Sequence, residues 1–173
     1  QDKTIFEKSY GWQNAEKKIP NQDKSVYQIA SLTKSFTALT IVKLSEEGKL
    51  SFKDPISKFI PDYPRGNEIT IEHLLNHTSG IYEALRNKEY FRLLHTGETI
   101  TKSKELSFFK NEPLDFEPGT QFSYTNSGYI LLGVIIEKVT GLSYEDAVRK
   151  IILNPLKMTH TGFDYLALKS PYK

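Results

Sequence analysis

The segment from Ser31 to Gly48 limits the possible folds of this chain more than any other part. It reads SLTKSFTALTIVKLSEEG, and its final glycine is the residue type that most often ends a helix. Its apolar residues cover more than one narrow stripe of a helix surface; they are Leu32, Phe36, Leu39, Ile41, Val42 and Leu44. A helix that is apolar on several sides is usually buried among other elements. The sequence therefore predicts a helix at the centre of the fold.

Most of the remaining chain is also predicted to be helical. Apolar spacing and capping residues indicate further helices over residues 71–77 after Thr70, 85–95, 103–110, 127–141 and 144–153 after Ser143. Residues 4–10 alternate in part between polar and apolar side chains and precede a glycine, so a short strand is predicted there. The length of 173 residues suits one domain or part of a larger one.

Composition argues against several classes of function. The formal net charge is only +2, and no dense run of Lys and Arg lies beside aromatic residues, so we expect no nucleic-acid partner. No apolar run approaches the length of a transmembrane segment. Cysteine is absent, which excludes disulfides, zinc–thiolate sites and a cysteine nucleophile. His73 and His77 have a metal-binding spacing, but no Glu follows His73, so we expect neither metal nor cofactor.

Ser31 and Lys34 lie three residues apart at the predicted start of the central helix, and so share one face of it. A serine hydroxyl is a poor nucleophile until a base takes its proton, and a desolvated lysine one turn away can be that base. The backbone N–H of Ser31 can also donate to a developing oxyanion. The alternative is that Ser31 only caps the helix while Lys34 is solvated. The pair alone leaves both interpretations open.

Tyr124 and Asn126 add a second motif, Tyr-Thr-Asn. A phenolic oxygen can transfer a proton if a nearby cation lowers its pKa, and Lys34 would be such a cation. The amide of Asn126 offers a donor and an acceptor, which could hold Lys34 and receive a substrate amide. The alternative is a loop tyrosine followed by an asparagine that caps the next helix.

Four blocks of the sequence resemble one known family, in the family's order. They are residues 27–63 with Ser-Leu-Thr-Lys, 69–81 with His-Thr-Ser-Gly, 116–148 with Tyr-Thr-Asn, and 154–163 with NPLKMTHTGF. The chain resembles the serine β-lactamase and D-alanyl-D-alanine carboxypeptidase (penicillin-binding protein) family, and its Tyr-x-Asn motif resembles the class C-like branch. The class A version has Ser-Asp-Asn at this position. The resemblance implies an α/β fold of the β-lactamase/transpeptidase type.

The resemblance also implies roles for the four residues. Ser31 would be acylated by a small-molecule or peptide substrate with a reactive carbonyl, such as a β-lactam, a D-alanyl peptide or an ester. Lys34 and Tyr124 would share the acid and base work, and Asn126 would orient Lys34 and the substrate. The chain would act in the periplasm or outside the cell. The alternative is a catalytically inactive fragment, or a sensor domain of the same fold that binds penicillin or peptidoglycan.

The third motif of the family, Lys-Thr-Gly or His-x-Gly on a sheet strand, has no match at the expected position. His95-Thr96-Gly97 precedes the Tyr-x-Asn motif and His160-Thr161-Gly162 follows it too closely, so both are predicted to be loop residues. We expect a partial domain, with a sheet-edge segment at 1–30, the nucleophile helix and helical domain at 31–163, and a truncated exit toward absent sheet strands at 164–173. Another segment or chain would supply these strands.

Overall fold

The computed structural model describes residues 3–96 and 98–163. The chain divides into two units, which are described separately below. The first unit consists of residues 1–31 and 162–173, and the second of residues 32–161. The predicted exit segment at 164–173 lies outside the described residues. Within the described part of the chain, no helix has the length and apolar character that crossing a membrane requires.

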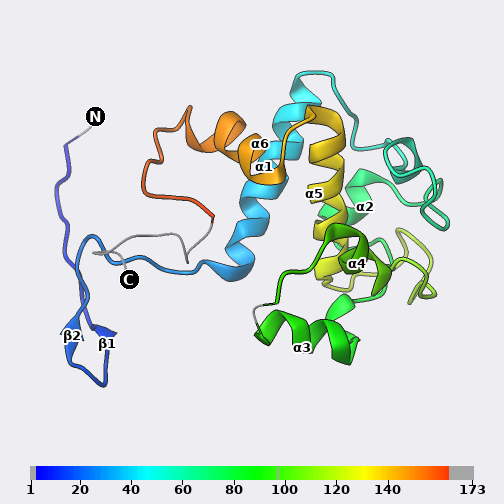
Figure 1. The fold of residues 1–173 in the computed structure, drawn as a ribbon. Coiled ribbons are helices and arrows are strands. Elements are labelled where there is room, and N and C mark those ends of the chain that lie inside the picture. Colours follow the sequence, from blue (N-terminus) through cyan, green and yellow to red (C-terminus); the bar gives the residue numbers. More distant parts are fainter. Residues whose placement is uncertain (1–2, 97, 164–173) are drawn as a thin grey trace. The chain divides into compact units, whose positions relative to one another are not determined.

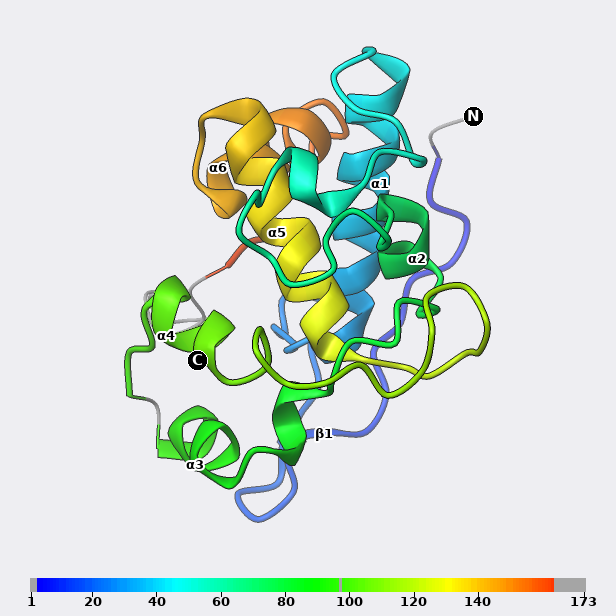
Figure 2. The ribbon, with the colours of Figure 1, turned by 90° about the vertical axis from the view of Figure 1, so that its right-hand side faces the viewer.

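Two helices form the centre of the second unit. Helix α1 spans Thr33–Glu46 and packs against α5, which spans Asn126–Thr140 (Figures 1 and 2). The buried side chains of α5 include Leu131, Leu132, Ile135 and Ile136. Helix α2, Ile71–Leu75, contacts α5, and α6, Tyr144–Val148, contacts both central helices. The core of this unit is therefore built mainly around α5.

The face that α1 buries differs in part from the predicted one. Leu39 and Val42 are exposed, whereas Thr37 and Thr40 are buried with Ile41 and Leu44. A threonine can be buried in a helix because its hydroxyl can donate to a carbonyl one turn back. Thr40 does so to Phe36 at 2.8 Å. The prediction of an all-round buried helix was therefore wrong for one side of α1.

The start of α5 also corrects the sequence interpretation. The N-cap is Thr125, whose hydroxyl accepts the backbone N–H of Ser127 at 3.1 Å, and the helix ends at Gly141 with φ 69°. Ser127 was predicted to open the helix, but it lies inside the first turn and is fully buried. Its hydroxyl instead accepts the N–H of Ala84 at 2.9 Å, which ties α5 to a distant loop.

The shorter helices surround this pair and largely match the predicted positions. They are the 3-10 helix Ile56–Lys58, the 3-10 helix Ala84–Arg86, α3 at Lys88–Thr96, α4 at Lys102–Ser107 and a π-helical segment at Arg149–Leu153 that follows α6. Thr70 caps α2 through a reciprocal capping box with His73, as its sequence position predicts. Ser143 likewise caps α6 by accepting the N–H of Asp146.

The first unit contains a small antiparallel hairpin. Strand β1, Trp12–Asn14, pairs with β2, Ile19–Pro20 (Figure 1). The strand predicted at 4–10 is absent from the described residues, which was an error of position. Ile5 and Phe6 are 95% and 73% exposed. A strand needs a partner edge to satisfy its backbone groups, and the described residues offer none to this segment.

Candidate active site

Lys34 and Asn126 form the centre of the candidate site. Lys34 lies in the first turn of α1 and is half-buried, and Asn126 is the first residue of α5. The ammonium of Lys34 donates to the amide oxygen of Asn126 at 2.7 Å. The solvated lysine of the alternative interpretation therefore does not describe this side chain. The packing of α1 against α5 is what brings the two residues together.

Tyr124 lies beside this pair on the extended segment before α5. The Lys34 ammonium is 4.9 Å from the centre of the Tyr124 ring and 5.5 Å from that of Tyr129. A cation over an aromatic face is attracted by the negative charge density of the ring. Tyr124 is 46% exposed, so its phenol can be reached from solvent. Three of the four predicted residues, Lys34, Tyr124 and Asn126, thus lie close together.

Glu83 belongs to this cluster and was missed by sequence reasoning. Its carboxylate accepts the backbone N–H of Asn126 at 2.5 Å and the side-chain amide of Asn126 at 3.4 Å. It also accepts the N–H of Leu85 at 2.9 Å, at the start of the 3-10 helix Ala84–Arg86. A single glutamate in a loop has no periodicity or spacing that would mark it.

His77 holds the segment that carries Tyr124. Its carbonyl accepts the N–H of Ser123 at 2.9 Å, and its Nδ1 accepts the N–H of Thr125 at 3.3 Å. Its ring lies 4.5 Å from the ring of Tyr124 and 5.1 Å from that of Tyr129. Burial lowers the pKa of His77, and the positive charge of Lys34 lowers it further. The imidazole is therefore held in its neutral form, with Nδ1 free of a proton.

Ser31 lies in a different local structure from the one predicted. It belongs to the first unit and to the 3-10 helix Ala30–Leu32, and α1 begins two residues later at Thr33. Leu32 is the N-cap of α1, and no side chain caps that end. Ser31 is therefore not the N-cap that the alternative interpretation required. Ala30 has φ 43°, a left-handed conformation that non-glycine residues rarely adopt and that costs free energy.

The two His-Thr sequences differ in local structure. His95-Thr96 lies in a helix, whereas His160 lies in a turn. His95 and Thr96 form the end of α3, and His95 Nδ1 contacts the carbonyl of Phe91 at 2.7 Å. This corrects the prediction that they are loop residues: His95 lies within the helix predicted at 85–95, and α3 extends one residue beyond it, to Thr96. Gly97 lies outside the described residues. His160 is exposed in the turn after the π-helical segment.

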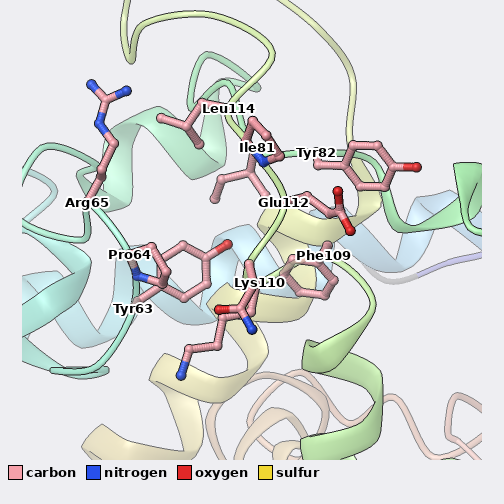
Figure 3. Close-up of a pocket in the computed structure, with 11 residues that line it drawn as sticks. Tyr63, Pro64, Arg65, Ile81, Tyr82, Phe109, Lys110, Glu112 and Leu114 are labelled. Carbon is pink, nitrogen blue, oxygen red and sulfur yellow. The ribbon is translucent and has the colours of Figure 1, made fainter.

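A pocket of about 230 Å³ lies elsewhere in the second unit (Figure 3). None of the four predicted site residues lines it. Its cations are already neutralised, since Arg65 pairs with Glu68 and Glu117 and Lys110 pairs with Asp62. Burial raises the pKa of Tyr63 in its wall. The described residues also contain no group of three or more His, Asp or Glu side chains placed to hold a metal ion.

Comparison with known proteins places the chain in a family. The family described as Beta-lactamase matches residues 1–172. The chain belongs to the beta-lactamase family. This beta-lactamase-family chain is 37% identical over 175 residues to Protein flp of Staphylococcus aureus, covering 98% of the chain and 34% of that protein. It therefore spans about a third of the length of this curated relative.

Two solved structures show the same fold. The penicillin binding protein from Bacillus halodurans matches with a TM-score of 0.82 and 35% identity, over 94% of this chain and 50% of that one. The D-amino acid amidase from Ochrobactrum anthropi matches with a TM-score of 0.77 and 30% identity, over 86% of this chain and 40% of that one. The predicted β-lactamase-like fold class is confirmed, with a mainly helical part and a small antiparallel sheet in this beta-lactamase-family chain.

Proposed function

We propose that this chain carries the nucleophile side of a serine hydrolase site and forms an acyl-enzyme on Ser31. The observation that carries the proposal is the Lys34–Asn126 hydrogen bond, with the Tyr124 ring beside the same ammonium. A lysine and a phenol can carry protons in acyl transfer, and the amide of Asn126 holds the lysine in place beside the phenol. Ser31 stands three residues before Lys34 in the chain.

The proposed reaction balances without any cofactor. The Ser31 hydroxyl oxygen attacks the substrate carbonyl carbon as the tetrahedral intermediate forms, and its proton passes to the base form of the pair, which is either the neutral amine of Lys34 or the phenolate of Tyr124 beside the Lys34 ammonium. The bond from the carbonyl carbon to the leaving nitrogen or oxygen then breaks, and the leaving atom takes up that proton. Water later attacks the ester on Ser31, which releases the acid and restores the hydroxyl. Asn126 keeps Lys34 in place and receives the amide of the substrate.

The substrate class rests on the family and on its structural neighbours. Members and neighbours include a penicillin binding protein and a D-amino acid amidase. We propose a β-lactam, a D-alanyl peptide or an ester as substrate, each with a carbonyl that Ser31 can attack. By the same resemblance, the protein would act in the periplasm or outside the cell.

We also propose that sheet strands from another segment or chain complete the site. Ile5, Phe6 and Trp12 of the first unit are more than half exposed, which suits a surface that further strands would cover. The larger size of the relative Protein flp, of which this chain spans 34%, is in accord with further segments. In penicillin-recognising hydrolases such strands would bring the second oxyanion donor.

Labelling with a fluorescent penicillin tests the proposed function. We expect a covalent adduct with the mass of one penicillin on the chain, lost in Ser31→Ala and retained in Ser35→Ala. Ser35 is a matched control because it is an exposed serine of α1 outside the cluster. An adduct that survives Ser31→Ala would assign the nucleophile elsewhere. No adduct with penicillins, D-alanyl peptides or esters would favour the inactive binding domain.

A further inference from the structure

Glu83 makes contacts that its chain position alone does not require. Its half-buried carboxylate receives three N–H groups, two from Asn126 and one from Leu85. A carboxylate that accepts several N–H groups is fixed in place more firmly than one with a single exposed partner. Asn126 in turn accepts the Lys34 ammonium. Hydrogen bonds therefore link the carboxylate of Glu83 to the amide of Asn126, and that amide to the ammonium of Lys34.

This chain of contacts decides which way the Asn126 amide points. An asparagine amide has a donor end and an acceptor end. Glu83 can only accept hydrogen bonds and Lys34 can only donate them. The observed orientation sends the NH₂ end to Glu83 and the oxygen to Lys34. The reversed amide would place oxygen against carboxylate and NH₂ against ammonium, which are two repulsive contacts.

We propose that Glu83 is a positioning residue of the acylation site, which fixes the Asn126 amide with its oxygen toward Lys34. It acts at two points, because it also holds the backbone N–H of Asn126 at the first turn of α5. Its effect on rate rests on the function proposed above. Its effect on the amide does not, so the two can be tested separately.

The first test reads the amide directly by NMR of ¹⁵N-labelled chain. The side-chain NH₂ pair of Asn126 is assigned by its loss in Asn126→Ala. We expect Glu83→Gln to shift this pair, since the NH₂ loses a charged acceptor. Glu89→Gln is the matched control, because Glu89 is an exposed glutamate paired with Arg92 on α3. An Asn126 NH₂ pair that keeps its position in Glu83→Gln would overturn the proposal.

A rescue experiment uses stability instead of spectra. Asn126→Asp would set a second carboxylate against Glu83, a repulsion that opposes the attraction between the new carboxylate and Lys34. Adding Glu83→Gln to this variant replaces one of the two carboxylates by an amide that can donate to Asp. We expect a higher thermal midpoint in the double variant than in Asn126→Asp alone. A midpoint that falls when Glu83→Gln is added would also overturn the proposal.

The third readout connects Glu83 to the reaction. Acylation by penicillin should slow by roughly ten- to hundredfold in Glu83→Gln, the size expected for loss of a charge-assisted hydrogen bond. In an Asn126→Ala background, the same change should slow it little further, because Glu83 acts through Asn126. Equal slowing in both backgrounds would contradict a positioning role. If the wild-type chain is not acylated while the NMR shift is observed, the proposed function fails and the role of Glu83 stands.

Discussion

Nδ1 of His77 accepts the backbone N–H of Thr125 at 3.3 Å, one residue from Tyr124 and one from Asn126. Because Nδ1 acts as the acceptor, this contact requires an imidazole without a proton on that nitrogen. The left-handed backbone of His77, with φ 58°, places its carbonyl on the N–H of Ser123 in the same segment. One histidine therefore holds both ends of the stretch that carries the candidate phenol.

Acid should destabilise the fold through His77. Its pKa is lowered in the folded chain, first by burial and then by Lys34, so the unfolded chain binds the proton more readily. The stability that neutral His77 contributes is present above the ordinary histidine pKa of about 6.5 and is lost as the pH falls below it. Thermal midpoints measured from about pH 8 to about pH 5 should show a decline.

The decline should be smaller in His77→Gln and should persist in His95→Gln. His95 is exposed at the end of α3, where its Nδ1 contacts the carbonyl of Phe91 and its ring lies beside the Phe91 ring. The assignment to His77 fails if His77→Gln follows the wild-type pH dependence.

Removal of either of the two proposed proton carriers, Lys34 and Tyr124, should slow acylation while the fold persists. Lys34→Ala and Tyr124→Phe should each lower the acylation rate constant by about 10²- to 10⁴-fold, the usual size of general acid–base catalysis. Tyr124→Phe keeps the ring under the Lys34 ammonium and removes only the hydroxyl. Tyr90→Phe is the control, since that phenol donates to Glu105 of α4 and is not part of the Lys34 cluster. Wild-type rates in Lys34→Ala and Tyr124→Phe would refute the assignment.

Tyr144, which is half-buried, and Tyr63, which is buried, should respond differently to loss of their hydroxyls. The Tyr144 hydroxyl lies 2.6 Å from that of Thr37 and links α6 to α1, so Tyr144→Phe should cost about 1 kcal/mol of unfolding free energy. Among the described residues the Tyr63 hydroxyl has no hydrogen-bond partner, so Tyr63→Phe should change stability by less than about 0.5 kcal/mol. Urea unfolding of both variants measures the difference. Equal losses would contradict the pairing of Tyr144 with Thr37.

Gly80 and Gly48 offer a matched pair for the turn after His77. Both have left-handed backbones, with φ 73° and 70°. A Cβ on Gly48 would meet nothing within 4 Å, so Gly48→Ala should cost about 1 kcal/mol from backbone strain alone. A Cβ on Gly80 would collide with the backbone carbonyl of Phe116. Gly80→Ala should therefore cost several times as much in urea unfolding, and similar costs would mean that Phe116 can move away.

The helices and their caps were predictable because their signals are local. Thr70 and Ser143 cap the first turns of α2 and α6, and Gly141 ends α5, in each case through contacts within a few residues. The roles of Ser127 and Glu83 were not predictable. Each depends on a partner 43 residues away, and nothing in the local sequence encodes that distance.

The candidate site was also predictable only in part. The Ser-x-x-Lys and Tyr-x-Asn motifs indicated three residues that lie together, because each motif has a fixed spacing. The buried face of α1 was misjudged because the backbone carbonyls that satisfy Thr37 and Thr40 are invisible in a hydropathy pattern. The hairpin at β1 and β2 was missed since its strands are only three and two residues long.

The Lys34–Asn126 hydrogen bond joins residues that are 92 positions apart. Closing so long a loop costs entropy, which only the docking of α5 on α1 can repay. In a nascent or partly folded chain, Lys34 is therefore hydrated, and Tyr124 and Asn126 are not yet held beside it. Reactivity toward an acylating compound would then appear only with completion of the core, so a covalent penicillin label would count correctly folded molecules and pass over the rest.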